Sequence, residues 1–254
     1  MRNLDMSLEL ERILSFIRDY THDAGFSKVV LGLSGGVDSA VCAALAVKAL
    51  GRENVTAVTM PYKTSHPDSH GDAIVLINQL GCQYAYVDIS PMADAYFEQS
   101  ESNLSPLRKG NWLARMRMCV LYDISAATHA LVVGTSNRTE LMVGYFTQYG
   151  DSACAFEPIG HLYKTEVWQL ARMLEIPARI VNKIPTADLW AGQTDEAELG
   201  MPYQELDEIV YALTDLDINI QATENLDFPL EQYLKVDKMI QRSAFKRQMP
   251  PVLE

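Results

Sequence analysis

Two kinds of apolar pattern alternate along this chain. Short runs rich in Val, Ile, Leu and Ala are typical of buried strands, and longer runs with an apolar face are typical of helices. The pattern predicts strands at residues 29–33, 54–60, 83–89 and 130–134, and helices at residues 7–20, 37–50, 73–80, 91–99, 111–128, 164–174, 203–213 and 230–243. Ser7 is the expected N-cap of the first helix. This alternation predicts an α/β fold, a doubly wound parallel sheet with helices on both faces.

Polar and irregular segments separate these elements. Residues 61–70 and 101–110 are predicted loops. Two longer stretches, residues 145–161 and 184–203, have no clear period, and loops of this length in a compact domain usually serve a function. Because residues 145–155 and the second long stretch hold few apolar anchors, we expect both to be mobile without ligand.

The composition excludes several classes of protein. The chain has 254 residues, is 48% hydrophobic and shows no internal repeat or low-complexity linker, so we expect one domain over residues 1–254. A net charge of −12 argues against a nucleic-acid partner, which would require basic stripes. The apolar runs are too short to span a membrane and the N-terminus lacks a signal-peptide core, so we expect no membrane partner and a cytoplasmic location.

The cysteines give no sign of a disulfide framework or metal site. They lie far apart, without a C-x-x-C pair, each in or beside an apolar segment: Cys42, Cys82, Cys119 and Cys154. Buried free thiols are therefore predicted, as in a reducing compartment. The five histidines also lack metal-ligand spacing.

A Ser-Gly-Gly-Val-Asp-Ser segment, residues 34–39, links the first predicted strand to the next helix. A strand that turns through glycines into a helix N-terminus makes an anion site, because backbone N–H groups and the helix dipole face the ligand. Ser34 and Ser39 add hydroxyl donors, and Asp38 adds a carboxylate that can hold a metal ion. A simple tight turn would explain the glycines but not Asp38 between two serines. Neither a Walker A loop nor a G-x-G-x-x-G pattern occurs.

Two further segments, residues 133–140 and the helix start at Lys164, are candidates for the same site as this loop. Residues 133–140 also follow a strand, and ligands bind beyond the carboxyl ends of the strands in such sheets. Glu140 could therefore join Asp38 on one Mg²⁺, which prefers carboxylate and phosphate oxygens, although alone it would be an ordinary solvated carboxylate. Lys164 begins a predicted helix and is available as a phosphate clamp, although a lone lysine there is usually exposed.

The loop resembles the signature of the ATP pyrophosphatases of the PP-loop superfamily, which cleave ATP to AMP and pyrophosphate. Further segments, in order, resemble one family closely, the ammonia-dependent NAD synthetases, over residues 29–203. These segments are Gly-Asn-Trp-Leu-Ala-Arg-Met-Arg-Met (110–118), Gly-Thr-Ser-Asn-Arg-Thr-Glu (134–140), Gly-Tyr-Phe-Thr-Gln-Tyr-Gly-Asp (144–151), Pro-Ile-Gly-His-Leu-Tyr-Lys-Thr-Glu (158–166), Pro-Thr-Ala-Asp-Leu-Trp (185–190) and Gly-Gln-Thr-Asp-Glu-Ala-Glu-Leu-Gly (192–200).

The resemblance implies amidation of deamido-NAD, with ATP as co-substrate and Mg²⁺ as cofactor. The nicotinate carboxylate attacks the α-phosphorus of ATP, pyrophosphate leaves, and ammonia then displaces AMP from the adenylate to give NAD. No side-chain nucleophile is required, because the protein positions the reactants and stabilises charge. The resemblance also implies a homodimer, for which residues 7–20 and 111–128 are available unless they only pack in the core. We expect no glutaminase domain, and so free ammonia as the nitrogen source.

The resemblance also assigns roles to residues at matching positions. The ATP site would comprise Gly32, Leu33, Ser34, Gly35, Gly36, Val37, Asp38, Ser39, Thr135, Lys164 and Thr186, and Mg²⁺ would bind Asp38 and Glu140. Arg115, Gln148 and Lys246 would contact deamido-NAD. Asp38 and Lys164 are the expected catalytic residues. Ammonium needs a proton acceptor at neutral pH, and Asp151 is our candidate for that role.

Three positions depart from the common family pattern. Gln148 stands where a lysine is usual, Ala155 where an aspartate is usual, and Phe245 where a histidine is usual. All three belong to the deamido-NAD side. Either the chain binds the same acid with other contacts, which the matches at Arg115 and Trp190 favour, or it acts on a different carboxylic acid. A non-catalytic ATP-binding protein of the same fold is the third alternative.

Overall fold

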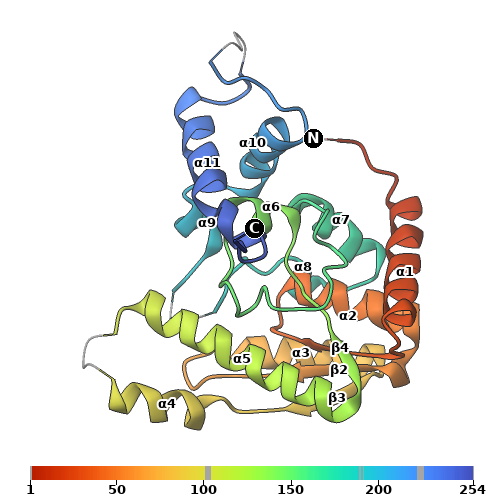
Figure 1. Ribbon diagram of the computed structural model, residues 1–254. Helices are drawn as coiled ribbons and strands as arrows, with labels where there is room; N and C mark the ends of the chain where they lie inside the picture. The colour runs from red at the N-terminus through yellow and green to blue at the C-terminus, as the bar shows by residue number, and fades with distance from the viewer. Residues whose placement is uncertain (1, 101–103, 189, 191, 222–225, 254) are drawn as a thin grey trace.

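A four-stranded parallel sheet forms the centre of the computed structural model, which describes residues 2–100, 104–188, 190, 192–221 and 226–253 (Figure 1). Its strands are β1 (Lys28–Gly32), β2 (Val55–Thr59), β3 (Gln83–Tyr86) and β4 (Ala130–Val132), in the order β3-β2-β1-β4. The chain builds outward from β1 to β3 and then crosses to place β4 on the other side of β1. The predicted doubly wound sheet is confirmed, with its topological switch point between β1 and β4.

Helices cover both faces of the sheet because the strand side chains alternate between two cores. Val29 and Leu31 of β1 enter a core shared with α1 (Met6–Asp23), α2 (Val37–Leu50), α3 (Pro67–Leu80), α7 (Lys164–Met173) and α8 (Ala178–Val181). Val30 enters the opposite core, which α4 (Ser90–Gln99) and α5 (Pro106–Thr128) cover. None of the described helices is long and apolar enough to cross a membrane.

A third core lies among the remaining helices. It packs α6 (Arg138–Val143), α9 (Asp195–Leu199), α10 (Tyr203–Thr214) and α11 (Leu230–Ser243) around Tyr163, Tyr203 and Leu206. Short 3₁₀ turns, η1 (Arg52–Asn54) and η2 (Ala244–Arg247), precede β2 and follow α11. Figure 1 shows α10 and α11 at the end of the molecule opposite α5. Helix α7 touches both this core and the first one, because Trp168 packs against each of them.

Several predicted helix boundaries are wrong, and polar first turns explain them. Helix α3 begins at Pro67, inside the predicted loop at 61–70, and α5 begins at Pro106, inside the predicted loop at 101–110; residues 101–103 of that loop lie outside the described residues. Proline at the first helical position is favourable but carries no apolar period. Ser7 is not the cap of α1, because the side chain of Asp5 accepts hydrogen bonds from the N–H groups of Ser7 and Leu8.

Two other expectations need correction. The stretch at 184–203 is not irregular throughout, because it contains α9, and residues 138–143 form the unpredicted α6. The four cysteines are free as predicted, but only Cys42 and Cys82 are buried, whereas Cys154 is half-buried and Cys119 is exposed. Cys119 lies on the solvent side of α5, and an apolar neighbourhood in sequence does not decide which side of a helix a residue occupies.

Candidate active site

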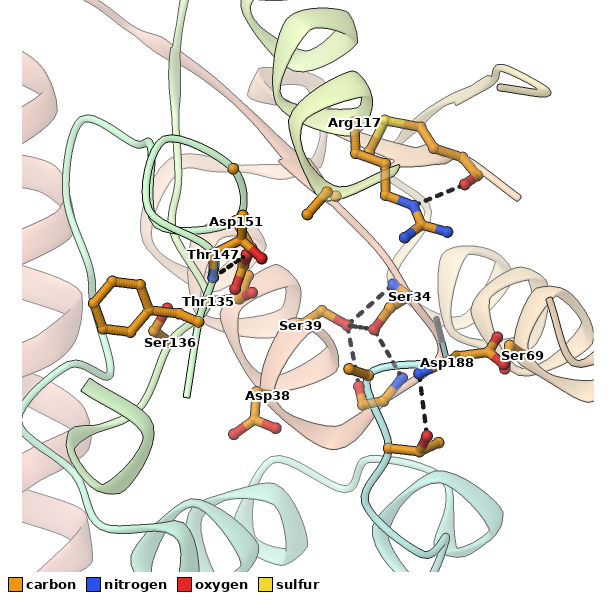
Figure 2. A pocket seen from close by; sticks show the side chains of 18 of the residues that line it. Ser34, Asp38, Ser39, Ser69, Arg117, Thr135, Ser136, Thr147, Asp151 and Asp188 are labelled. Atoms are coloured by element: carbon orange, nitrogen blue, oxygen red, sulfur yellow. Dashed lines mark hydrogen bonds between the residues drawn. The ribbon is translucent and has the colours of Figure 1, made fainter. Parts of the chain in front are cut away.

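The Ser-Gly-Gly-Val-Asp-Ser loop is folded on itself by its two serines (Figure 2). Ser34 N–H donates to Ser39 Oγ over 3.2 Å, the two hydroxyl oxygens are 3.1 Å apart, and Ser39 Oγ donates to Gly36 O over 3.1 Å. Gly36 is the N-cap of α2 and provides no side-chain cap. The first N–H groups of this 14-residue helix are therefore left for an anion, with the positive end of the helix dipole behind them.

Gly35 lets the loop lie against the start of α3. Its φ is +80°, in the left-handed region that favours glycine, and a Cβ at this position would lie 2.2 Å from the backbone oxygen of Ser69. Figure 2 shows Ser69 beside the loop. Both the backbone conformation and the close approach therefore require a residue without a side chain.

A buried ion cluster lies next to this loop. Lys164 Nζ is 2.6 Å from Asp38 Oδ2 and 3.0 Å from Glu140 Oε1, and Asn137 Nδ2 donates to Asp38 Oδ1 over 2.9 Å. The three charged side chains come from α2, α6 and α7. Lys164 is 2% exposed, so it is not the solvated lysine that its sequence position alone would favour. The structure thus brings together the three charged residues that the sequence singled out.

Burial and opposite charges set the protonation of this cluster. Burial raises the pKa of the Glu140 carboxyl, against the effect of Lys164. Burial would lower the pKa of the Lys164 ammonium, but the charges of Asp38, Glu140 and Asp195 outweigh it, so the pKa is raised. The Tyr203 ring lies 4.9 Å from Lys164 Nζ and adds a cation–π contact. Lys164 therefore stays cationic at neutral pH.

Asp38 and Glu140 also fit a magnesium ion. Each places a carboxylate oxygen within 3.0 Å of Lys164 Nζ, so the two carboxylates lie close together on one side of the cavity. No group of three or more His, Cys, Asp or Glu side chains suited to a metal occurs among the described residues. Mg²⁺ commonly binds one or two carboxylates and completes its shell with substrate phosphates and water. The pair suits an ion that arrives with a nucleotide.

One cavity of about 960 Å³ joins the loop and the ion cluster at the switch point. The residues of the predicted site that line it are Gly32, Leu33, Ser34, Gly36, Val37, Asp38, Ser39, Thr135, Glu140, Asp151, Lys164, Thr186 and Lys246. Its volume is at the upper end of the usual range for ligand sites, about 300–1,000 Å³. The cavity is large enough for a nucleotide together with a second substrate.

Three residues of the predicted site lie outside the lining of this cavity. Gly35 faces Ser69, as described above, and Arg115 Nη2 donates to Gln148 O over 3.2 Å. The roles of Arg115 and Gln148 toward deamido-NAD stay predictions. Of the other departures from the family pattern, Ala155 N–H donates to Val132 O along β4, and Phe245 is 61% exposed.

Asp151 and Lys246 line the part of the cavity that is formed by a turn and by η2. Asp151 Oδ1 accepts a hydrogen bond from Thr147 N over 2.8 Å, and burial raises the pKa of its carboxyl (Figure 2). Lys246 Nζ donates to the backbone oxygens of Gly144 and Phe146 over 2.8 and 2.9 Å. Lys246 thereby ties η2 to the segment that carries Asp151.

Arg117 is a cavity residue that the sequence analysis missed. Its Nε donates to Met60 O over 3.1 Å, and among the described residues no carboxylate lies within salt-bridge distance of its guanidinium. Burial lowers its pKa, and the charges of Asp188 and Asp151 partly offset that effect. Arg115 and Arg117 are two positions apart, so they leave the helix in different directions. The pair of arginines was the available signal, but their spacing alone does not show which one faces the cavity.

These features define a class of protein. A glycine loop between β1 and α2 that leaves helix N–H groups for an anion, a pair of carboxylates beside a buried lysine and a cavity at the switch point are typical of a nucleotide-binding α/β protein of the ATP-pyrophosphatase kind. The family model described as NAD synthase matches residues 9–250. The chain belongs to the NAD synthase family.

Individual relatives agree with this assignment. The NH(3)-dependent NAD(+) synthetase of Fusobacterium nucleatum is 46% identical over 252 residues, which cover 98% of this chain and 97% of that protein. Among solved structures, NMN synthetase from Francisella tularensis matches with a TM-score of 0.87 and 32% identity over 99% of both chains. The NH3-dependent NAD synthetase from Campylobacter jejuni matches with a TM-score of 0.84 and 37% identity, over 99% of this chain and 100% of that one.

Proposed function

We propose that this chain catalyses the ATP-dependent amidation of deamido-NAD with ammonia, releasing NAD, AMP and pyrophosphate. The observation that carries the proposal is the single cavity that contains the phosphate loop and the cluster of Asp38, Glu140 and Lys164. The near-full-length similarity to ammonia-dependent NAD synthetases supports the choice of acid and of nitrogen source.

The chemistry follows from the groups that line the cavity. The N–H groups at the start of α2 and the hydroxyls of Ser34 and Ser39 bind the β- and γ-phosphates of ATP. Asp38 and Glu140 would hold Mg²⁺, which neutralises charge on the phosphate oxygens when it is bound. Lys164 stabilises the negative charge that grows on pyrophosphate as the acid carboxylate attacks the α-phosphorus. The product of this step is the acyl adenylate, which ammonia then converts to the amide and AMP.

Incubation with ATP, Mg²⁺, deamido-NAD and ammonium tests the proposed function. We expect NAD, AMP and pyrophosphate in equal amounts, no product when EDTA removes Mg²⁺, and little product when glutamine replaces ammonium. ATP binding without AMP release would contradict the proposal and support a non-catalytic nucleotide-binding protein.

A second candidate substrate is the mononucleotide counterpart of deamido-NAD. The TM-score of 0.87 to an NMN synthetase favours it, as do the departures at Gln148, Ala155 and Phe245, which the family resemblance assigns to the acid substrate. The 46% identity to NAD synthetases favours the dinucleotide. Comparing kcat/KM for the two acids under the same conditions decides between them, and we expect the higher value for deamido-NAD.

Asp151 is our proposed proton acceptor for ammonium. The raised pKa of its buried carboxyl makes it a stronger base than an exposed aspartate. We expect Asp151→Asn to slow the amidation step about 100-fold, because an amide cannot take the proton but can still accept the hydrogen bond from Thr147 N. Pyrophosphate exchange into ATP in the presence of deamido-NAD should persist, since adenylation precedes that step. Equal loss of both reactions would contradict this role.

The assembly and location are also proposals. We propose a homodimer, which the exposed apolar side chains Leu8, Phe16 and Tyr20 on α1 and Tyr122 on α5 support. We propose that the protein works in the cytoplasm, in keeping with its four free cysteines.

A further inference from the structure

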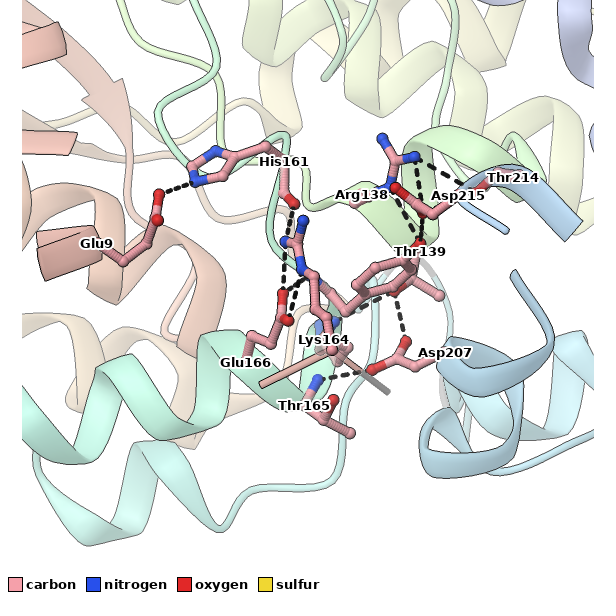
Figure 3. Close-up of polar contacts among 12 residues, drawn as sticks. Glu9, Arg138, Thr139, His161, Lys164, Thr165, Glu166, Asp207, Thr214 and Asp215 are labelled. Atoms are coloured by element: carbon pink, nitrogen blue, oxygen red, sulfur yellow. Dashed lines mark hydrogen bonds and ion pairs between the residues drawn. The ribbon is translucent and has the colours of Figure 1, made fainter. Parts of the chain in front are cut away.

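A buried carboxylate outside the cavity is bound to the segments that carry the ion cluster. Asp207 of α10 is 0% exposed and does not line the cavity. Figure 3 shows it beside Thr139 and Thr165. Asp207 Oδ1 accepts a hydrogen bond from Thr139 Oγ1 over 2.5 Å, and Asp207 Oδ2 accepts one from Thr165 N over 2.8 Å. Thr139 Oγ1 in turn accepts a hydrogen bond from Lys164 N over 3.2 Å.

These contacts place Asp207 directly behind two reactive side chains. Thr139 precedes Glu140 in α6, and Thr165 follows Lys164 at the start of α7. The N–H groups of Lys164 and Thr165 have no partner within their own helix, because they belong to its first turn. One carboxylate, with the Thr139 hydroxyl, therefore fixes the backbone beside both Glu140 and Lys164.

Packing alone does not explain a charged residue at this position. No Lys, Arg or His lies within salt-bridge distance of Asp207 among the described residues, and burial raises the pKa of its carboxyl to about 6. A buried charge without a counter-ion is costly unless hydrogen bonds hold it. Glu166 in the first turn of α7 is also a buried carboxylate, but it has a counter-ion, because Arg2 Nε lies 2.9 Å from its Oε1. Asp207 differs from Glu166 in this respect.

We propose that Asp207 is a positioning residue that holds Glu140 and Lys164 in register for Mg²⁺ and ATP, through Thr139 and Thr165. The proposal rests on the function proposed above. Asp207 touches no substrate. Its effect is to keep the Glu140 carboxylate and the Lys164 ammonium, at 3.0 Å from each other, on one side of the phosphate site.

The test compares variants that break or keep the hydrogen bonds. Asp207→Asn retains the size of the side chain but leaves one donor without an acceptor, Thr139→Val removes the hydroxyl, and Thr139→Ser keeps it. Ile209→Ala is the control, because it destabilises the same helix from a buried position without touching α6 or α7 through polar contacts. The readouts are the affinity for ATP by calorimetry with and without Mg²⁺, and kcat and KM for pyrophosphate release.

We expect Asp207→Asn and Thr139→Val each to weaken ATP binding about 10-fold in the presence of Mg²⁺ and to lower kcat, with KM for deamido-NAD unchanged. Thr139→Ser should keep both values near those of the wild type. The double variant should lose less than the two single losses added together, since the two residues share one hydrogen bond. Binding of ATP without Mg²⁺ should weaken less, because it depends on Lys164 but not on the Mg²⁺ held by Glu140.

Two results would overturn the proposal. One is wild-type affinity for ATP with Mg²⁺ in a folded Thr139→Val variant, which is available even if Asp207→Asn does not fold. The other is an equal loss in Ile209→Ala at the same melting temperature, which would indicate a purely structural role. Failure of the proposed function is distinguishable, because the wild-type chain would then bind ATP with Mg²⁺ and release no pyrophosphate with deamido-NAD.

Discussion

Replacing Lys164 by methionine is expected to lower the rate of pyrophosphate release about 10³-fold. Methionine has a similar length but provides neither the positive charge nor the donors that contact Asp38 and Glu140 at 2.6 and 3.0 Å. Because Lys164 is buried and already oriented, its proposed stabilisation of charge on the leaving group requires no reorganisation, and a single such donor is worth about 10²–10³ in rate. The measurement is kcat for pyrophosphate release with saturating ATP, Mg²⁺ and deamido-NAD.

A lysine on the surface provides the matched control for this prediction. Lys48 lies near the end of α2, is exposed, and is absent from the cavity lining. Lys48→Met should keep kcat within about two-fold, because an exposed charge far from the reaction contributes little. A Lys164→Met variant that folds and keeps a tenth of the wild-type rate would exclude the proposed role in stabilising the leaving group.

The Gly35→Ala variant is expected to lose about 100-fold or more in activity and to be less stable than the parent chain. Alanine at φ +80° costs about 1–2 kcal/mol in backbone strain. Its Cβ would also meet Ser69 O at 2.2 Å, and since that atom is backbone, the loop itself must move. A shift of about 1 Å would misplace the N–H groups that we propose to bind phosphate. The measurements are kcat/KM for ATP and the melting temperature.

A Gly25→Ala variant distinguishes the two causes of that loss, which are the backbone strain and the close contact with Ser69 O. The φ of Gly25 is +81°, almost the same as that of Gly35, but nothing lies within 4 Å of a Cβ built on it. Gly25→Ala should therefore show the backbone strain of about 1–2 kcal/mol and keep the wild-type rate. If Gly35→Ala kept its affinity for ATP while losing only the stability that Gly25→Ala loses, the close contact with Ser69 would be irrelevant to the loop.

The sequence was sufficient for the sheet and for the proximity of Asp38 and Glu140. The alternating strand and helix pattern placed β1 and β4 in a parallel sheet, so the segments after them had to meet at one edge. That logic located Asp38 and Glu140 near each other although 102 positions separate their numbers, 38 and 140. The glycines and serines of residues 34–39 predicted an anion site by themselves, because that prediction depends on no contact with distant residues.

The remainder of the site depends on contacts that local patterns do not encode. Asp207 reaches Thr139 across 68 positions, and α10 shows only an ordinary amphipathic period in sequence. The same holds for Tyr203, whose buried ring lies over Lys164 and would be taken for a core aromatic. The starts of α3 and α5 were missed for a different reason, since their first turns are polar and hydrophobic periodicity cannot report them.

The three helices that contribute the ion cluster do not share one core. Asp38 is on α2, which packs in the first core, whereas α6 and its Glu140 belong with the third core, and α7 joins the two through Trp168. The ion cluster therefore forms only when the helices of the third core pack against those of the first. A local opening that releases α10 and α11 would disassemble the cluster while the sheet stays folded. If such an opening precedes unfolding of the sheet, activity would be lost on heating while the sheet is still folded.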